Sequence, residues 1–381
     1  MNDGTHTILG ILPEQGGSIA NLRRSGQDSR FIEQYLRLYV REFDEVHYFS
    51  YARERADPPV AENFYLHSNP GLHRWLYSFL MPLLHARTFR RCSVLRVMQA
   101  TGALPARVAR LLFGVPFVVT YGYHYSTELR AAGRRLRAWL FDRRVEWALR
   151  HANGIIVTTP ALAEFVGRYA AAERVALIPN SVDTARFSPG PAAKPASPRR
   201  RLIAVGGLTA NKNHRLIVEA VALTGRDDLE VVILGTGPEE AALRAIAAET
   251  NVALELPGIV PNETLPEWLR GAEAYVISSL SEGHPKSLLE AMSVGLPCVG
   301  TDVRGIRDVL VQGKTGRLCP PRADALAAAI QEVLSDRETA RALGARARDF
   351  ILANHDAQAV IAREIAFLKD IAARSRSRDC T

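Results

Sequence analysis

Short apolar runs rich in β-branched residues alternate with segments of helical spacing along most of this chain. Strands that alternate with helices in this way favour an α/β fold built on a parallel, doubly wound sheet. In the first 180 residues the predicted strands are residues 8–12, 45–50, 94–98, 117–120 and 154–158. The predicted helices are residues 29–43, 72–84, 106–113 and 134–151.

A second cycle of strands follows a stretch rich in proline and alanine, which is typical of a linker. Its predicted strands are residues 201–205, 229–234, 253–256, 266–269, 274–278, 298–301 and 313–318. A chain of 381 residues is too long for one ordinary core and fits two α/β domains. The expected divisions are a first domain at 1–183, a linker at 184–200, a second domain at 201–353, a crossover helix at 354–372 that packs back on the first domain, and a disordered tail at 373–381.

The net charge of +8 suits an anionic membrane face, an acidic substrate or nucleic acid. Aromatic residues form no recognisable RNA-binding motif with the arginines, so we expect no nucleic acid partner. The four cysteines are widely spaced, which predicts neither a disulfide framework nor a zinc site. The N-terminus lacks a signal-peptide pattern, and no segment is long and apolar enough to span a membrane. We therefore expect a cytoplasmic protein, with peripheral contact to the inner face of an anionic membrane left open.

One predicted helix has a wide aromatic and leucine face with basic residues interspersed. Its apolar residues are Leu72, Trp75, Leu76, Phe79, Leu80, Leu83 and Leu84. Stripes of this kind usually pack in a core, and we expect that here. The alternative is a helix that lies on a membrane.

The most informative stretch is residues 274–307. A short strand leads to turn residues, a helix is predicted to begin at Pro285, and Gly295 followed by Pro297 is a stop signal. The N–H groups of Lys286 and Ser287 would then point out of the helix N-terminus, where the dipole favours an anion such as phosphate. Two acids flank this seat, Glu282 before the helix and Glu290 within it. Each acid taken alone is more often simply solvated, whereas beside a bound diphosphate it would accept hydrogen bonds from sugar hydroxyls.

The combined pattern E-G-x-P-x4-E-A-M-x2-G-x-P, starting at Glu282, is far more specific than its parts. It resembles the signature of the retaining family-four glycosyltransferases, in which the first glutamate contacts the donor sugar and the second the ribose. The segment IPNSVDTARFSP, from Ile178, resembles the end of the first domain in that family, with Ser181 in place of the usual glycine. The resemblance covers most of the chain but is specific only from about residue 178 to 316. It implies the GT-B fold, in which two Rossmann-like domains face each other across a cleft.

The same resemblance implies roles for the residues of the donor site. Glu282 would orient the sugar and Glu290 the ribose, while Gly283, His284 and Pro285 would shape the donor loop and Lys286 and Ser287 would present the helix N-terminus. The segment VGGLTANKN resembles the family's VGRL-x3-KG, in which an arginine and a lysine grip the diphosphate. Here Gly206 and Lys212 match, but Gly207 stands in place of the arginine. Arg215 and Arg304 are candidates for the missing charge.

Two loops of the first domain are candidates for the acceptor side. The family commonly has a histidine after the strand that residues 117–120 resemble, and this chain has TYGYHY there. His124 is the best candidate for that polar contact near the reacting sugar, with an ordinary loop residue as the alternative. Ser25, Gly26 and Gln27 precede the predicted helix 29–43, where glycine lets the backbone approach a ligand. A flexible surface loop is the alternative for this segment.

The resemblance therefore implies a hexosyltransferase that moves a sugar, with retention, from a UDP- or GDP-linked donor to a glycan or lipid-linked acceptor. Surface polysaccharide or glycoconjugate biosynthesis is the expected setting. No cofactor is implied, and no DxD-like pair lies in a convincing loop, so we predict no obligatory metal. Two alternatives remain: a non-catalytic GT-B binding subunit of a glycan-assembly complex, and a sugar-nucleotide epimerase or hydrolase, which would need a better acid/base set.

Overall fold

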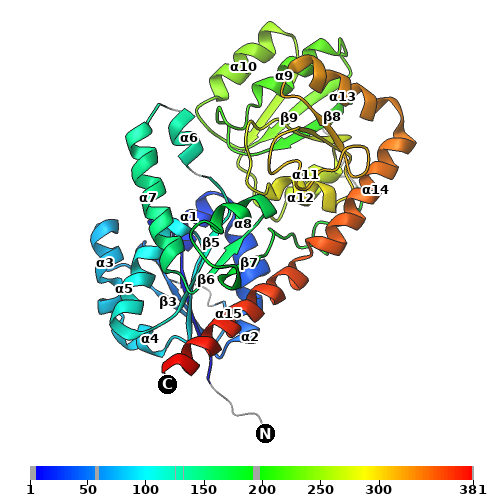
Figure 1. Ribbon diagram of the computed structural model, residues 1–381. Helices are drawn as coiled ribbons and strands as arrows, with labels where there is room; N and C mark the ends of the chain where they lie inside the picture. Colours follow the sequence, from blue (N-terminus) through cyan, green and yellow to red (C-terminus); the bar gives the residue numbers. More distant parts are fainter. Residues whose placement is uncertain (1–5, 56–59, 125, 132, 192–197, 380–381) are drawn as a thin grey trace. The chain divides into compact units, whose positions relative to one another are not determined.

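The computed structural model describes residues 6–55, 60–124, 126–131, 133–191 and 198–379 (Figure 1). The chain divides into two compact units. Unit 1 comprises the chain up to Pro179 together with the segment from Gln358 onward, and unit 2 comprises Asn180–Ala357.

Unit 1 is built on a seven-stranded sheet in the order β3-β2-β1-β4-β5-β6-β7, with every neighbouring pair parallel. The parallel sheet predicted from the alternation of strands and helices is thus confirmed. The central strands are almost wholly buried, as expected for a sheet covered on both faces. The strands are β1 (Ile8–Leu12), β2 (Glu45–Phe49), β3 (Phe64–His67), β4 (Val94–Val97), β5 (Phe117–Tyr121), β6 (Gly154–Val157) and β7 (Val175–Leu177).

The helices of unit 1 differ from the predicted ones in two places. The predicted helix 29–43 is a π-helix over Arg30–Leu36 that continues as α2 (Arg37–Glu42). A short α1 (Ile19–Arg24) precedes it, because Ser18 caps its N-terminus by accepting a hydrogen bond from the Asn21 N–H. The others are α3 (Arg74–Leu84), α4 (Ala86–Arg91), η2 (Ala100–Gly102), α5 (Ala103–Phe113), α6 (Ser126–Ala131), α7 (Arg135–His151), α8 (Pro160–Val166) and η3 (Ala172–Arg174).

Unit 2 contains a six-stranded parallel sheet in the order β10-β9-β8-β11-β12-β13. One predicted strand is wrong: residues 266–269 lie in the helix α11 (Leu265–Arg270). Leu265 and Leu269 are buried and four positions apart, which is helical spacing, and Pro266 lies in the first turn, where proline is tolerated. The strands are β8 (Arg200–Val205), β9 (Leu229–Leu234), β10 (Ala253–Gly258), β11 (Ala274–Ile277), β12 (Cys298–Thr301) and β13 (Arg317–Cys319).

Helices connect these strands and cover the sheet of unit 2. Buried residues on both faces of the sheet form two hydrophobic clusters, so unit 2 has its own core. The helices are α9 (Arg215–Leu223), α10 (Glu240–Glu249), α11, α12 (Lys286–Ser293), α13 (Ala323–Ser335) and α14 (Arg337–Asn354).

The segment expected to act as a linker is partly structured. Phe187 is 2% exposed and packs in the core of unit 2, and Arg348 donates to its carbonyl at 3.1 Å. Residues 192–197 of the predicted linker lie outside the described residues. At the other end, α15 (Ala357–Asp379) is one continuous helix, so the disordered tail predicted from residue 373 is wrong through Asp379. The basic composition of that tail does not oppose helix formation, since arginine is a good helix former.

A buried polar cluster attaches α15 to the rest of unit 1. Glu364 of α15 accepts a hydrogen bond from the Arg96 guanidinium of β4 and another, 2.5 Å long, from the Tyr39 hydroxyl of α2. All three side chains are almost completely buried. Burial and the neighbouring Glu364 carboxylate raise the pKa of Tyr39, so the hydroxyl stays protonated and donates. The long-range contacts of these three residues fix the helix on the sheet.

The three cysteines within the described part of the chain are buried thiols. Burial raises the pKa of Cys92 to about 12 and that of Cys319 to about 11, and burial raises the pKa of Cys298 as well. The thiolate is the reactive species. We expect these three residues to resist iodoacetamide at pH 8 in the native protein and to react fully in urea. Peptide mapping by mass spectrometry checks each cysteine separately, and native labelling of Cys298 would contradict its placement.

Candidate functional site

The residues of the predicted donor site come from loops at the carboxyl ends of strands in unit 2. In parallel α/β sheets ligands bind at this edge. Gly206 follows β8, Gly235 follows β9, and residues 278–285 connect β11 to α12. The sheet order places β8 between β9 and β11, so these loops are neighbours.

Lys212 and Glu282 form an ion pair at the centre of this edge. The Lys212 Nζ lies 2.5 Å from Glu282 Oε1, and the Ser279 hydroxyl donates to the same oxygen at 2.6 Å. The Glu282 side chain is 10% exposed and that of Lys212 is 28% exposed. The lysine is therefore not a solvated loop residue, and the carboxylate is held in one position. A ligand that enters here meets a cation and an acceptor side by side.

The loop that carries Glu282 is held by contacts that the sequence did not reveal. Asn211 donates from its side chain to the Ser281 carbonyl at 3.0 Å, and Asn180 donates to the His284 carbonyl at 2.7 Å. Gly305 has φ +88°, and a Cβ there would lie 2.3 Å from the Glu282 carbonyl oxygen. Only glycine fits this position. Asn180 and Gly305 are thus positioning residues that motif spacing alone could not identify.

The helix α12 begins one residue later than predicted, at Lys286, with Pro285 as its N-cap residue. The Ser287 hydroxyl accepts from Tyr275 at 2.8 Å and donates to the Val205 carbonyl at 3.2 Å. This anchors the first turn of α12 to β8 and β11. The predicted stop is confirmed, because Gly295 follows the helix with φ +78°.

Glu290 is a buried acid, 3% exposed, on α12. The side-chain amide of Asn262, also 3% exposed, donates to Glu290 Oε1 at 3.1 Å. An acid on a helix is usually solvated, so its burial here indicates a specific role for the carboxylate. Asn262 follows β10 and was not identified from the sequence, since a single asparagine in a loop carries no distinguishing signal.

Two buried histidines flank the ion pair and are neutral at neutral pH. Burial lowers the pKa of His214 to about 4, helped by the Lys212 charge and opposed by the backbone of Gly206 and Gly207. Burial, with smaller effects from His355 and Lys286, lowers the pKa of His284 to about 3. Neither ring is an acid/base group with a pKa near 7, so the site is suited to positioning and electrostatics rather than to proton transfer by these histidines.

These shifts predict that stability falls in mild acid. An unfolded histidine has a pKa near 6.5, so between that value and the lowered folded pKa the unfolded state binds more protons. The stabilisation is present above pH 6.5 and is lost as the pH falls toward 4. We expect the free energy of unfolding to fall between pH 7 and pH 5, by up to about 1.4 kcal/mol per pH unit for each fully buried histidine. Urea titrations at the two pH values check this, and His214→Asn should make the dependence shallower.

Glycines let three loops of this edge approach one another. A Cβ on Gly235 would lie 2.0 Å from the Gly206 carbonyl oxygen, and one on Gly237 would lie 2.3 Å from the Leu208 carbonyl oxygen. The G-T-G-P turn is therefore required for tight backbone packing, as its weak motif value suggested. Gly207 differs from both, because its Cβ would meet atoms only at 3.7 and 3.8 Å.

The candidate acceptor residues lie in unit 1. His124 follows β5, and its Nδ1 lies 2.7 Å from the Tyr121 hydroxyl while its ring packs edge-on against Phe165. Ser25, Gly26 and Gln27 end α1 rather than opening the next helix: Gly26 has φ +66°, and the Gln27 N–H donates to the Leu22 carbonyl at 2.8 Å. A helix end explains this glycine without a ligand. The acceptor roles of both segments stay predictions.

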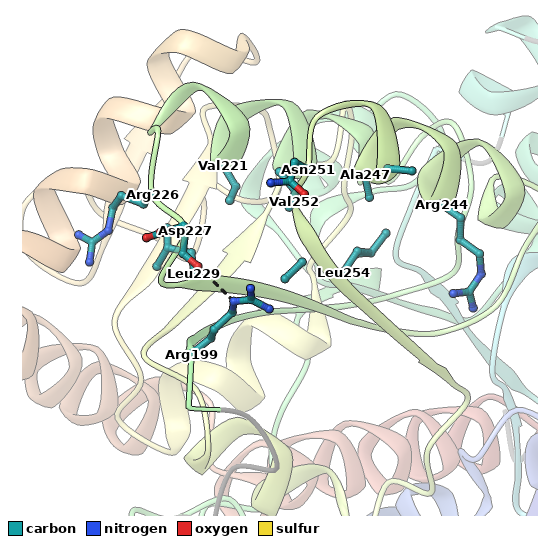
Figure 2. Close-up of a pocket in the computed structure, with 12 residues that line it drawn as sticks. Arg199, Val221, Arg226, Asp227, Leu229, Arg244, Ala247, Asn251, Val252 and Leu254 are labelled. Atoms are coloured by element: carbon teal, nitrogen blue, oxygen red, sulfur yellow. Dashed lines mark hydrogen bonds between the residues drawn. The ribbon is translucent and has the colours of Figure 1, made fainter.

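A cavity of about 410 Å³ in unit 2 lies away from this site (Figure 2). Leu229 at the start of β9 and Ala253 at the start of β10 line it, so it lies at the amino ends of the strands. Figure 2 also shows Arg199 donating to the Asp227 carbonyl at its rim. Its position at the opposite edge of the sheet separates it from the donor residues.

The fold and the sequence together define the class of this protein. Two parallel Rossmann-like units are the GT-B arrangement of secondary structure. Residues 29–186 match the family described as Glycosyltransferase Family 4, and residues 191–350 match the one described as Glycosyl transferases group 1. Together these matches span most of the chain, which belongs to the family-four GT-B glycosyltransferases.

Curated relatives come from bacterial glycan assembly. The chain is 34% identical over 211 residues to the putative colanic acid biosynthesis glycosyltransferase WcaL of Escherichia coli, covering 51% of each chain. It is 28% identical over 239 residues to a GDP-mannose-dependent phosphatidylinositol monomannoside mannosyltransferase of Mycobacterium tuberculosis, covering 57% of this chain and 62% of the relative. The chain thus spans about half to two thirds of the length of these relatives.

Solved structures share the fold along the whole chain. Sucrose-phosphate synthase from Thermosynechococcus elongatus superposes with a TM-score of 0.77 at 20% identity, covering 97% of this chain and 100% of that one. Anabaena HepE, solved in complex with UDP and glucose, superposes with a TM-score of 0.72 at 15% identity, covering 96% and 100%. These likenesses confirm the predicted GT-B fold.

Proposed function

We propose that the protein is a retaining glycosyltransferase that takes a sugar from a nucleoside-diphosphate sugar. The observation that carries the proposal is the Lys212–Glu282 pair beside the N-terminus of α12. A cation, a fixed carboxylate and a helix N-terminus are the groups that a diphosphate with a sugar on one side requires. Buried Glu290 on the same helix adds an acceptor for the ribose hydroxyls on the other side.

In this proposal the residues act by positioning and electrostatics. The diphosphate takes the Lys212 ammonium as a partner, and Lys212 with the first turn of α12 stabilises the charge that grows on the leaving group. Glu282 accepts hydrogen bonds from the sugar hydroxyls. The bond from the anomeric carbon to the diphosphate breaks, the acceptor oxygen bonds to that carbon from the same face, and the departing phosphate oxygen takes the acceptor proton. His124 is proposed to contact the reacting sugar, and Ser25, Gly26 and Gln27 to lie on the acceptor side.

A glycan or lipid-linked acceptor in polysaccharide or glycolipid biosynthesis is the setting that the relatives support. UDP- and GDP-linked donors both occur among the relatives' and neighbours' names. We propose that transfer takes place in the cytoplasm at the inner membrane face and needs no metal. Transfer should therefore be unchanged in EDTA, and a rate restored only by magnesium would contradict this.

The first test is a calorimetric and thermal-shift screen of the purified protein against UDP, GDP, ADP and their sugar conjugates, with and without magnesium. A ligand that binds only the folded state raises the melting temperature. We expect one nucleotide to bind without metal and Lys212→Ala to weaken it at least about tenfold, since a hydrogen bond to a charged group contributes about 1.5–3 kcal/mol. If no nucleotide binds, the non-catalytic subunit becomes the better description of the chain.

Gly207→Arg is expected to fold normally and to bind the donor nucleotide more tightly. The added side chain starts in open space, and it restores the cation that the family has at this position. Arg215 does not obviously replace that cation, because it pairs with Glu219 at 2.7 Å. The expected gain is about tenfold in nucleotide affinity. Gly237→Ala is the matched control, since its Cβ clashes with the Leu208 carbonyl and should lower the melting temperature. Unchanged affinity in Gly207→Arg would mean that another residue already supplies the charge.

A further inference from the structure

Exposed apolar side chains gather on three helices of unit 1. Of the seventeen large hydrophobic residues exposed in the described part of the protein, ten lie on α3, α5 and α7. Every one of the ten is at least 41% exposed. We refer to these ten residues as the apolar patch. Contiguous exposed apolar surface on a folded protein usually marks an interaction site.

The predicted core stripe of α3 faces solvent instead. Tyr77 and Met81 point into the core and are fully buried, whereas Trp75, Phe79 and Leu83 are 41%, 54% and 54% exposed. These three residues are four positions apart, so they form one continuous face of the helix. The expectation of a core stripe is therefore wrong, because the small buried side of α3 is enough to attach it to the sheet. A wholly apolar outer face remains.

The neighbouring helices extend this face. α3 packs against α5 and α5 against α7, and the Arg144 guanidinium of α7 lies 4.5 Å from the centre of the Trp75 ring of α3. Figure 1 shows α3, α5 and α7 together on one side of unit 1. On α7 the exposed residues Leu136, Trp139 and Leu140 lie on one face, since they are three and four positions apart.

The segment that carries the patch is rich in arginine and nearly free of acids. Residues 63–151 contain fourteen arginines and three carboxylates, and residues 63–127 contain no carboxylate at all. Arg74, Arg135 and Arg137 are exposed next to the apolar residues. The surface therefore combines aromatic and leucine side chains with an excess of positive charge.

We propose that the apolar patch docks unit 1 on an anionic lipid bilayer. Leucine and phenylalanine enter the acyl boundary, tryptophan lies at the headgroup level, and the arginines reach the lipid phosphates. No helix in the described residues is long and apolar enough to cross a membrane, so the contact is interfacial. The proposal rests on the proposed function in that it supplies the surface at which a lipid-linked acceptor is reached.

Charge argues for lipid rather than for a second copy of the chain. A two-fold interface would place the same arginine-rich surface against itself, and like charges that face each other at an interface are unfavourable. An anionic bilayer is complementary to the same surface. Each arginine near such a membrane contributes about a fivefold gain in binding.

The test is co-sedimentation of the full chain with vesicles of phosphatidylcholine containing 30% phosphatidylglycerol, at about 150 mM salt. We expect binding to these vesicles and at least tenfold weaker binding to pure phosphatidylcholine. Lipids brominated on their acyl chains should quench Trp75 and Trp139 on the patch, and Trp75→Phe with Trp139→Phe should remove that quenching. Leu76→Ser with Phe79→Ser should weaken binding about tenfold or more. Leu223→Ser, at a residue 62% exposed in unit 2, is the matched control and should bind as the unchanged protein does.

Arg135→Glu with Arg137→Glu tests the charge and should weaken vesicle binding at least about tenfold, while Arg341→Glu on α14 should not. Glu282→Gln should bind vesicles normally, which separates failure of docking from failure of the donor site. Equal binding to neutral and anionic vesicles would overturn the proposal. Absence of binding together with a dimer by sedimentation velocity that Leu76→Ser with Phe79→Ser dissociates would overturn it in favour of a second copy.

Discussion

Replacing Glu282 with glutamine is expected to lower the rate of sugar transfer at least about 100-fold, because removing one preorganised polar group from such a site typically costs this much. The glutamate is the partner of both Lys212 and Ser279, and glutamine keeps the shape while losing the charge. A steady-state assay with the nucleotide sugar identified by the binding screen measures the effect. Activity within a few fold of the unchanged protein would contradict the role proposed for Glu282.

The control for this substitution lies in the same unit. Glu219→Gln removes the charge of a glutamate that is paired with Arg215 on the surface of α9, and it should leave the rate unchanged. Both variants should keep the melting temperature within a few degrees, since neither pair is fully buried. Measuring nucleotide affinity alongside the rate separates the two functions of the site: we expect Glu282→Gln to affect transfer more than binding of the nucleotide alone.

Much of this site could be predicted because its local signals agree with one another. The turn at Gly283, the helix that starts near Pro285 and the stop at Gly295 are encoded within fifteen residues, so each follows from short-range backbone chemistry. The structure then places Lys212 against Glu282, seventy residues away. The sequence indicated this pairing only through the family resemblance. Spacing along the chain carries no distance information between separate loops.

The positioning residues could not be predicted for a related reason. Asn180, Asn262 and Gly305 each act on the donor loop or on α12 from a distant part of the chain. A single asparagine or glycine in a loop has many ordinary explanations. Their function becomes visible only when the fold brings them to the same edge of the sheet.

The error on α3 has a different origin. Periodicity identifies a helix and its apolar face, but it does not say whether that face meets the protein or something else. Here the buried side is formed by Tyr77, Ser78 and Met81, and the more hydrophobic side is exposed. An amphipathic pattern whose apolar side faces outward is itself information about a partner.

Replacing Glu364 with alanine is expected to destabilise unit 1 by about 3–5 kcal/mol, because it leaves the Arg96 guanidinium buried without its counter-charge. The Arg96 side chain is 4% exposed and that of Glu364 is 5% exposed, so water cannot replace the lost partner. The Tyr39 hydroxyl loses its acceptor at the same time. Urea unfolding followed by tryptophan fluorescence is a suitable measurement, since Trp75, Trp139 and Trp147 all lie in unit 1.

A matched control comes from the same helix. Lys369 of α15 pairs with Glu42 of α2 at 2.8 Å, but the two side chains are 40% and 52% exposed. Lys369→Ala should therefore cost less than about 1 kcal/mol, because exposed pairs are weak. Replacing both Arg96 and Glu364 with apolar residues should recover part of the loss, since no unpaired charge then remains in the core. Equal effects of Glu364→Ala and Lys369→Ala would mean that α15 is held by its apolar contacts alone, and the buried cluster would lose its proposed role in fixing the helix on the sheet.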